Sequence, residues 1–208
     1  MAHRDFRDFL NDLESGGHLR KISKPVDPRD MSALGEQIPE ATLFENIEGY
    51  PDWRVATALV STRARLAVAM GCTENRIAFE FEERATKPID PVVVEDAPCQ
   101  EVVLEGDDVD LTSLPLPLMH LFDGGAYISG TFAVSEDPEH GPNVGCYRLM
   151  YRSPKETGID LVSPSDMRFY YQRALDEGKP LPIAIAVGVH PLDMLAASYK
   201  APIDSSEL

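Results

Sequence analysis

Three residue types within one short stretch could do chemistry together. Asn143, Gly145 and Arg148 lie in the segment 141–148, GPNVGCYR. The amide oxygen of Asn143 is a hard ligand, which suits Mg²⁺ or Mn²⁺. Gly145 lets the backbone approach a ligand closely, and the planar, permanently charged guanidinium of Arg148 matches a carboxylate or a phosphate. The stretch therefore indicates a site for a metal ion and an anion.

Strands predicted at 127–135 and 147–151 flank this stretch, because both runs are rich in β-forming residues and a turn rich in proline and glycine separates them. If the intervening strand begins near Val144, alternation puts Val144, Cys146 and Arg148 on one face. A guanidinium on an apolar face needs an anionic partner, since burying it unpaired is costly. The alternative is a hairpin with a polar turn and a solvated arginine.

Strands alternate with helices in residues 1–106, which predicts an N-terminal α/β domain. Phe6, Phe9, Leu10 and Leu13 recur at helical spacing and predict a helix over 4–15. The other predicted helices cover 31–38, 64–70 and 74–85. The predicted strands cover 18–22, 42–47, 55–60, 92–94 and 101–104.

Composition changes after Gly106, where the proline-interrupted run 111–118 predicts an extended connection. Residues 107–208 then favour a second, mostly β domain. Besides the two strands around the candidate site, this domain is predicted to contain a helix at 165–177, a strand at 183–189 and the start of a helix at 193–197.

Charge and cysteine content exclude several classes of protein. The 208-residue chain carries a formal net charge of −16, which argues against nucleic-acid binding through a basic patch. No run approaches the length of a membrane span. The three cysteines, Cys72, Cys99 and Cys146, are too far apart for a zinc knuckle or a disulfide framework. The amphipathic, charged N-terminus does not read as a signal peptide, so we expect a cytoplasmic protein.

Six segments, in order along nearly the whole chain, resemble the UbiD family of decarboxylases, which depend on prenylated flavin mononucleotide (prenylated FMN). The segments are 6–19 (FRDFLNDLESGGHL), 43–51 (LFENIEGYP), 101–117 (EVVLEGDDVDLTSLPLP), 123–130 (DGGAYISG), 143–149 (NVGCYRL) and 180–191 (PLPIAIAVGVHP).

The resemblance implies an α+β fold, with an N-terminal α/β domain over 1–106 and a split β-barrel that binds the flavin over 107–208, incomplete at its C-terminus. The implied activity is reversible decarboxylation of an unsaturated or aromatic carboxylic acid. The implied cofactors are prenylated FMN and Mn²⁺ or Mg²⁺, with K⁺ as a further ion. The implied partners are the small carboxylic-acid substrate, a flavin prenyltransferase that supplies the cofactor and, for the full-length form, further copies of the same protein.

The resemblance also implies roles for individual residues. Asn143 and Glu207 match metal ligands of the family. Arg148 matches the arginine of the family's Glu-Arg-Glu catalytic network. The residues that match flavin-contacting positions are Asn143, Cys146, Tyr147, Arg148, Asp160, Leu161 and Val162.

Two features depart from the family pattern. Where the family usually has a histidine, about twenty residues after the asparagine, this chain has residues 163–166, SPSD. Glu207 is followed by a single residue, whereas family members run to more than twice this length and carry their two catalytic glutamates beyond this point. A general acid must reach the carbon that it protonates, so we expect this chain alone to be inactive. Two alternatives remain open: a non-catalytic subunit that binds flavin or a partner, and a split-barrel flavin oxidoreductase.

Overall fold

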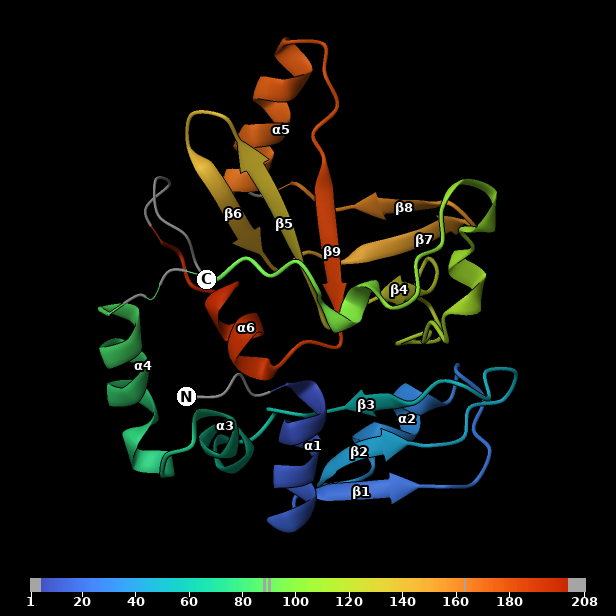
Figure 1. Ribbon diagram of the computed structural model, residues 1–208. Coiled ribbons are helices and arrows are strands. Elements are labelled where there is room, and N and C mark those ends of the chain that lie inside the picture. The colour runs from blue at the N-terminus through green and yellow to red at the C-terminus, as the bar shows by residue number, and fades with distance from the viewer. Residues whose placement is uncertain (1–4, 88, 90, 163, 202–208) are drawn as a thin grey trace.

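The computed structural model describes residues 5–87, 89, 91–162 and 164–201, and within them the fold is a mixed α+β arrangement. The strands of these described residues form three sheets of three strands each. One sheet belongs to the N-terminal part and two belong to the C-terminal part, with helix α6 (Pro191–Ala196) in the region between them (Figure 1).

The N-terminal sheet has the order β1-β2-β3, with β2 parallel to β1 and antiparallel to β3. Its strands are β1 (Leu19–Ile22), β2 (Ala41–Phe44) and β3 (Val55–Thr57). The helices of this part are α1 (Phe6–Ser15), α2 (Met31–Glu36), α3 (Arg63–Met70) and α4 (Ile77–Ala85). These elements confirm the predicted ones to within a few residues at each end.

Local capping explains where two of these helices begin and end. The Asp5 side chain accepts from the Asp8 backbone N–H at 2.8 Å, and Asp8 bonds back to the Asp5 N–H, which satisfies two donors of the first turn of α1. The Thr62 hydroxyl caps α3 by accepting the Arg65 backbone N–H, without a reciprocal bond. Gly71 ends α3 in the left-handed conformation with φ 64°, which glycine adopts without strain.

Two apolar clusters hold the N-terminal part together. Phe9 and Leu13 of α1 pack with Ala41 of β2 and Ala69 of α3. On the other side, Phe44 belongs to a cluster completed by Val26, Met31 and Ile47. Strand β2 is buried along its whole length, and it contributes Ala41 to the first cluster and Phe44 to the second.

The C-terminal part consists of two antiparallel sheets, ordered β4-β7-β8 and β6-β5-β9. The strands are β4 (Tyr127–Ile128), β5 (Thr131–Asp137), β6 (Gly141–Gly145), β7 (Leu149–Ser153), β8 (Glu156–Ile159) and β9 (Ile183–Val187). Helix α5 (Asp166–Asp176) follows β8. The described residues form no closed barrel. Where the sequence predicted a split barrel, the structure shows these two small sheets.

Two strand predictions need correction. The single strand predicted at 127–135 is two strands in different sheets, because Gly130 adopts φ 67° between β4 and β5 and interrupts the extended backbone. The predicted strands at 92–94 and 101–104 do not form. Val93 is 94% exposed and Val102 is 77% exposed. Strand propensity is expressed only where a neighbouring strand accepts the backbone hydrogen bonds, and the described chain provides none here.

Helices α5 and α6 cover opposite faces of the β6-β5-β9 sheet. Phe132 and Val144 point to one face and pack against Ala197, which directly follows α6. Asp137 points to the other face, where it pairs with Arg173 of α5.

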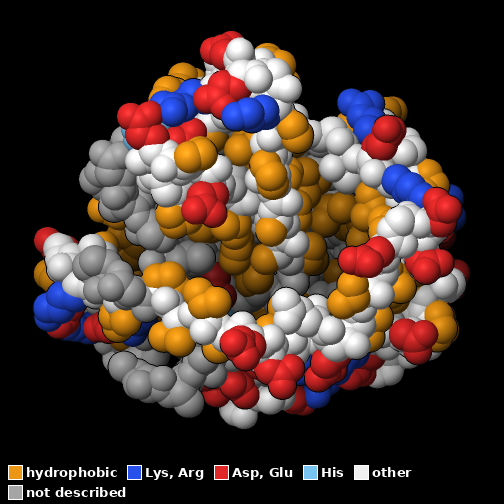
Figure 2. Space-filling view, turned by 45° about the horizontal axis from the view of Figure 1, so that its top comes forward, with side chains coloured by type: hydrophobic (Ala, Val, Ile, Leu, Met, Phe, Trp, Pro, Cys, Tyr) orange, Lys and Arg blue, Asp and Glu red, His pale blue; other side chains and the backbone are white. Residues whose placement is uncertain are grey.

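The surface reflects the acidic composition of the chain. Figure 2 shows hydrophobic side chains along a recess in the middle of one face, with acidic side chains gathered along its lower border. The described residues contain no helix long and apolar enough to cross a membrane.

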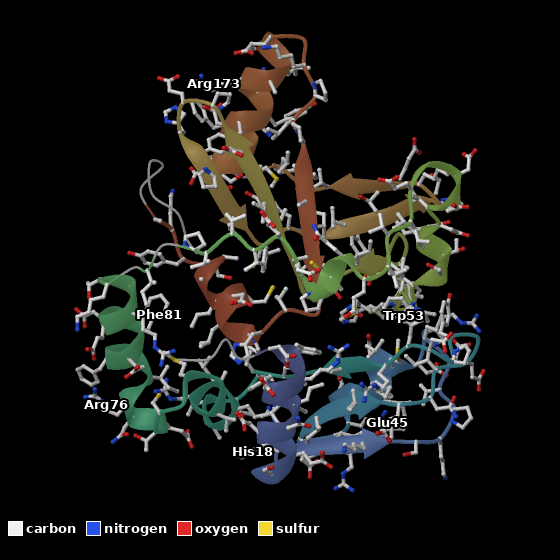
Figure 3. All side chains as sticks on the ribbon, viewed as in Figure 1. His18, Glu45, Trp53, Arg76, Phe81 and Arg173 are labelled. Atoms are coloured by element: carbon white, nitrogen blue, oxygen red, sulfur yellow. The ribbon has the colours of Figure 1, made fainter. Side chains whose placement is uncertain are left out.

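A buried carboxylate fixes the turn between β5 and β6. Asp137 is 4% exposed and accepts the backbone N–H groups of Glu139 at 2.9 Å and His140 at 3.2 Å. The Nε of Arg173 lies 3.1 Å from Asp137, and its Nη2 lies 2.8 Å from Glu139 (Figure 3). Burial raises the pKa of Asp137, but the two N–H groups and the guanidinium outweigh it, and the net pKa lies below the ordinary 3.8.

We expect Asp137→Asn to lower the melting temperature at pH 7 and to flatten its acid dependence. A depressed folded-state pKa stabilises the protein above the unfolded-state pKa near 3.8, and this stability is lost as the pH falls through the folded-state pKa. The difference between the parent and Asp137→Asn should therefore shrink below about pH 4. Thermal melts from pH 2 to 7 measure it. The control is Glu139→Gln, which removes an exposed partner of the same arginine, and an equal effect there would contradict the assignment.

Candidate functional site

A cavity of about 690 Å³ lies where β5, β6, the start of α5 and the residues after α6 meet. Segments from four separate parts of the chain contribute to its wall. The lining residues used below are Thr131, Asn143, Gly145, Cys146, Tyr147, Arg148, Asp160, Ser165, Asp166, Met194, Ser198 and Lys200.

Most of the site residues predicted from the sequence line this one cavity. They are Asn143, Cys146, Tyr147, Arg148 and Asp160. Leu161 and Val162 are not among the lining residues, and Val162 is 82% exposed. Glu207 lies outside the described residues, and so does Ser163. Asn143 is 6% exposed, so its side chain is held within the protein at the cavity wall.

The predicted sharing of one strand face by Val144, Cys146 and Arg148 is wrong. Strand β6 ends at Gly145, and Arg148 lies in the loop just before β7. Val144 is buried, whereas the Arg148 side chain is 72% exposed. The guanidinium is thus a solvated group at the cavity and is not buried on an apolar face. Burial therefore does not oblige it to have an anionic partner.

A close contact between Gly145 and Tyr147 accounts for the end of β6. A Cβ at position 145 would lie 2.6 Å from Tyr147 Cε2 and 3.0 Å from its hydroxyl oxygen. Only glycine leaves room for the ring to fold back over the strand end. The carbonyl of Tyr147 accepts the Thr131 hydroxyl at 3.0 Å, which ties the turned loop to β5.

Arg148 and Asp160 form an ion pair across the β7–β8 hairpin, with 3.0 Å between Nη2 and Oδ2. Asp160 also accepts the Val162 backbone N–H at 3.2 Å. That N–H and the Arg148 guanidinium lower the pKa of Asp160, so the carboxylate stays charged near neutral pH.

The residues after α6 were missed by sequence reasoning. The Cys146 Sγ lies 3.3 Å from the Ser198 hydroxyl and 3.6 Å from the Met194 carbonyl, which attaches the cavity loop to α6. Lys200 contributes a second cation to the cavity. No local signal marks these residues, because their role comes from the contact of α6 with the loop after β6, 48 positions earlier in the chain.

The start of α5 occupies the place where the family pattern has its histidine. Ser165 caps the helix by accepting the Arg168 N–H, and Asp166 opens its first turn. The described residues contain no group of three or more histidine, cysteine, aspartate and glutamate side chains arranged for a metal ion. Ser165 and Asp166 offer oxygen donors in the same cavity as Asn143.

Comparison with known proteins identifies the class. Residues 91–208 match the family model described as the 3-octaprenyl-4-hydroxybenzoate carboxy-lyase Rift-related domain, and residues 10–85 match the N-terminal domain of the same carboxy-lyases. The chain belongs to the UbiD family.

Similar proteins and structures support this membership. The chain is 34% identical over its whole length to a phenolic acid decarboxylase of Streptomyces sp. (strain D7), of which it covers 47%. The structure of an evolved dimeric form of the UbiD-class enzyme HmfF from Pelotomaculum thermopropionicum, in complex with prFMN, matches with a TM-score of 0.92 at 32% identity and covers 99% of this chain and 49% of that one. Vanillic acid decarboxylase of Sedimentibacter hydroxybenzoicus, in closed form, matches with a TM-score of 0.92 at 33% identity, covering 100% and 47%. The chain spans about half the length of these relatives.

We expect Gly145→Ala to destabilise the protein by about 1–3 kcal/mol, because the added methyl group forces the Tyr147 ring out of its place. The matched control is Gly124→Ala, whose Cβ would meet only the Met150 methyl at an ordinary 3.8 Å. Urea unfolding measures both variants, and near-ultraviolet circular dichroism reports the tyrosine environment. Equal stability of the two variants would contradict the contact.

Proposed function

We propose that this chain binds prenylated FMN and forms part of a carboxy-lyase that acts reversibly on an unsaturated or aromatic carboxylic acid. The observation that carries the proposal is the convergence of Asn143, Arg148 and Asp160 on one cavity, in a chain whose fold matches UbiD-class structures across its length. Two of the matched structures contain prFMN or FMN.

The cavity suits a flavin nucleotide in size and in chemistry. Its volume of about 690 Å³ lies within the range of about 300–1,000 Å³ found for small-molecule sites. Arg148 and Lys200 supply positive charge for a phosphate, and the hydroxyl of Ser198 supplies a further polar contact. The Tyr147 ring offers an apolar surface beside them.

Each proposed residue has a physical task. Arg148 would bind an anion, either the FMN phosphate or the substrate carboxylate, which it would orient beside the flavin. Asn143, with Glu207, would hold Mn²⁺ or Mg²⁺ through oxygen ligands, and K⁺ is a further candidate ion. Cys146, Tyr147 and Asp160 would contact the flavin from the loop side. Bound prenylated FMN supplies the electron sink that allows CO₂ to leave.

The remaining expectations from the family resemblance belong to the same proposal. The sheets β4-β7-β8 and β6-β5-β9 would form parts of a split barrel, with the domain boundary near residue 106. Leu161 and Val162 would reach the flavin once it is bound. A flavin prenyltransferase would supply the cofactor, the full-length form would assemble with copies of itself, and the protein would work in the cytoplasm.

A second reading, a subunit that binds flavin without catalysing the reaction, has its own support. Among the described residues, the carboxyl groups that line the cavity are those of Asp160 and Asp166. Asp160 is committed to an ion pair as a charged group, which makes it a poor general acid. No glutamate is among the lining residues that the structure describes, and on this ground the 208-residue chain alone is proposed to be inactive.

We expect Arg148→Ala to weaken FMN binding roughly tenfold or more, since a hydrogen bond to a charged group contributes about 1.5–3 kcal/mol. Asn143→Ala should weaken it in the presence of Mn²⁺ but much less without the metal. Titration followed by flavin fluorescence measures both. Arg29→Ala, which removes an exposed arginine paired with Asp27 in the N-terminal part, is the control. Unchanged FMN affinity in both cavity variants would refute the proposed site.

We further expect no release of CO₂ from aromatic carboxylic acids, such as 4-hydroxybenzoate, by this chain reconstituted with prenylated FMN. The physical reason is that the cavity lining, within the described residues, includes no glutamate, and that Asp160 is held there as the charged partner of Arg148. Trapping of labelled CO₂ from carboxyl-labelled substrate makes the measurement sensitive. Sustained turnover above the cofactor-free control would show that the chain catalyses the reaction by itself.

A further inference from the structure

Sheet register brings Arg148 and Asp160 together. Leu149 at the start of β7 pairs with Ile159 at the end of β8. Arg148 precedes the first of these residues and Asp160 follows the second, so the two side chains occupy the next opposed position of the hairpin. Their 3.0 Å contact is thus favoured by the register of the hairpin.

Asp160 is itself anchored. Its Oδ1 accepts the Val162 backbone N–H at 3.2 Å while its Oδ2 accepts from Arg148 Nη2. A guanidinium has five N–H donors, and this bond uses one of them. Within the described chain the other donors of Arg148 have no hydrogen-bond partner, and the residue lines the cavity.

We propose that Asp160 is a positioning residue of the cavity. It accepts one hydrogen bond from Arg148 Nη2 and so fixes the guanidinium in an orientation in which the remaining Arg148 donors bind the anionic group of the ligand. The inference rests on the proposed function for the identity of that anion, which is the cofactor phosphate or the substrate carboxylate. In this positioning role, which is separate from any contact of its own with the flavin, Asp160 acts through Arg148.

Two physical effects of Asp160 on an incoming anion have opposite signs. Its negative charge repels the anion, so an Asp160 that merely competed for Arg148 would weaken binding. By contrast, an arginine that is 72% exposed loses rotamer freedom when it binds a ligand, and a pre-anchored side chain has already lost it. If Asp160 positions Arg148, removal of the Asp160 carboxylate should weaken anion binding by about two- to tenfold. This loss is expected even though the same substitution removes a charge that repels the anion.

The first experiment measures FMN affinity in Asp160→Ala and Asp160→Asn. The alanine variant should bind FMN about two- to tenfold more weakly, whereas the asparagine variant, which keeps an acceptor oxygen, should stay close to the parent. In an Arg148→Ala background, Asp160→Ala should have no further effect. Asp107→Ala, which breaks the exposed pair with Lys155, controls for loss of a surface ion pair. Tighter FMN binding in Asp160→Ala would overturn the proposal.

Two further titrations distinguish the anions. Riboflavin lacks the phosphate, so a loss that affects FMN and spares riboflavin assigns Arg148 to the phosphate. Benzoate binding to the FMN-loaded protein tests the carboxylate in the same way. Equal affinities of the parent and Asp160→Ala for FMN and for benzoate would contradict a positioning role for either anion.

The last measurement needs no ligand. In the free protein, the ¹⁵N heteronuclear NOE of Arg148 Nε should indicate an ordered side chain, which becomes mobile in Asp160→Ala and stays ordered in Asp160→Asn and Asp107→Ala. Unchanged order in Asp160→Ala would overturn the proposal whatever the protein binds. Loss of order together with an absence of flavin binding by the parent would refute the proposed function and leave the positioning role supported.

Discussion

The two-sided packing of α6 is the constraint on which the rest of the structure depends. One side of this short helix contributes Leu192 and Leu195 to the cluster around Met70 in the N-terminal part. The other side contributes Met194, which packs with Val144 of β6. His190 caps the helix and meets the Phe9 ring edge-on at 5.4 Å between centroids. Because α6 bridges the two parts, the residues that follow it close one wall of the cavity.

The electrostatics of the cavity follow from the same arrangement. In a chain with a net charge of −16, an arginine or lysine side chain tends to pair with a nearby acidic side chain. The hairpin register pairs Arg148 with Asp160 through one of its donors and leaves the other Arg148 donors at the cavity. Lys200, near the end of the described chain, lines the same cavity. The cavity is thus lined by two cations, Arg148 and Lys200, together with two carboxylates, Asp160 and Asp166, within an otherwise acidic surface.

The helices of the N-terminal part could be predicted because the spacing of apolar residues such as Phe9 and Leu13 is a local signal, and the structure shows that capping and termination are local as well. Asp5, Thr62 and Gly71 each act on backbone groups a few residues away. The same reasoning failed for 92–94 and 101–104, since strand formation depends on a partner that no local pattern supplies. It also failed at Gly130, where one apolar run divides between two sheets. The segment 141–148 was predicted to be part of a site. The end of β6 at Gly145, which places Arg148 in a loop, was not predicted.

The sequence by itself determined which chemical groups are available: an amide at Asn143, a glycine at 145, a guanidinium at Arg148 and the order of family segments that contains them. Tertiary structure decided how these groups are presented. It ended β6 at Gly145 under the Tyr147 ring, kept Arg148 solvated instead of buried, paired it with Asp160 and brought Ser198 and Lys200 to the same cavity. The reason is physical, because residue types follow from the sequence directly, whereas exposure and partners arise from contacts between segments that are distant along the chain.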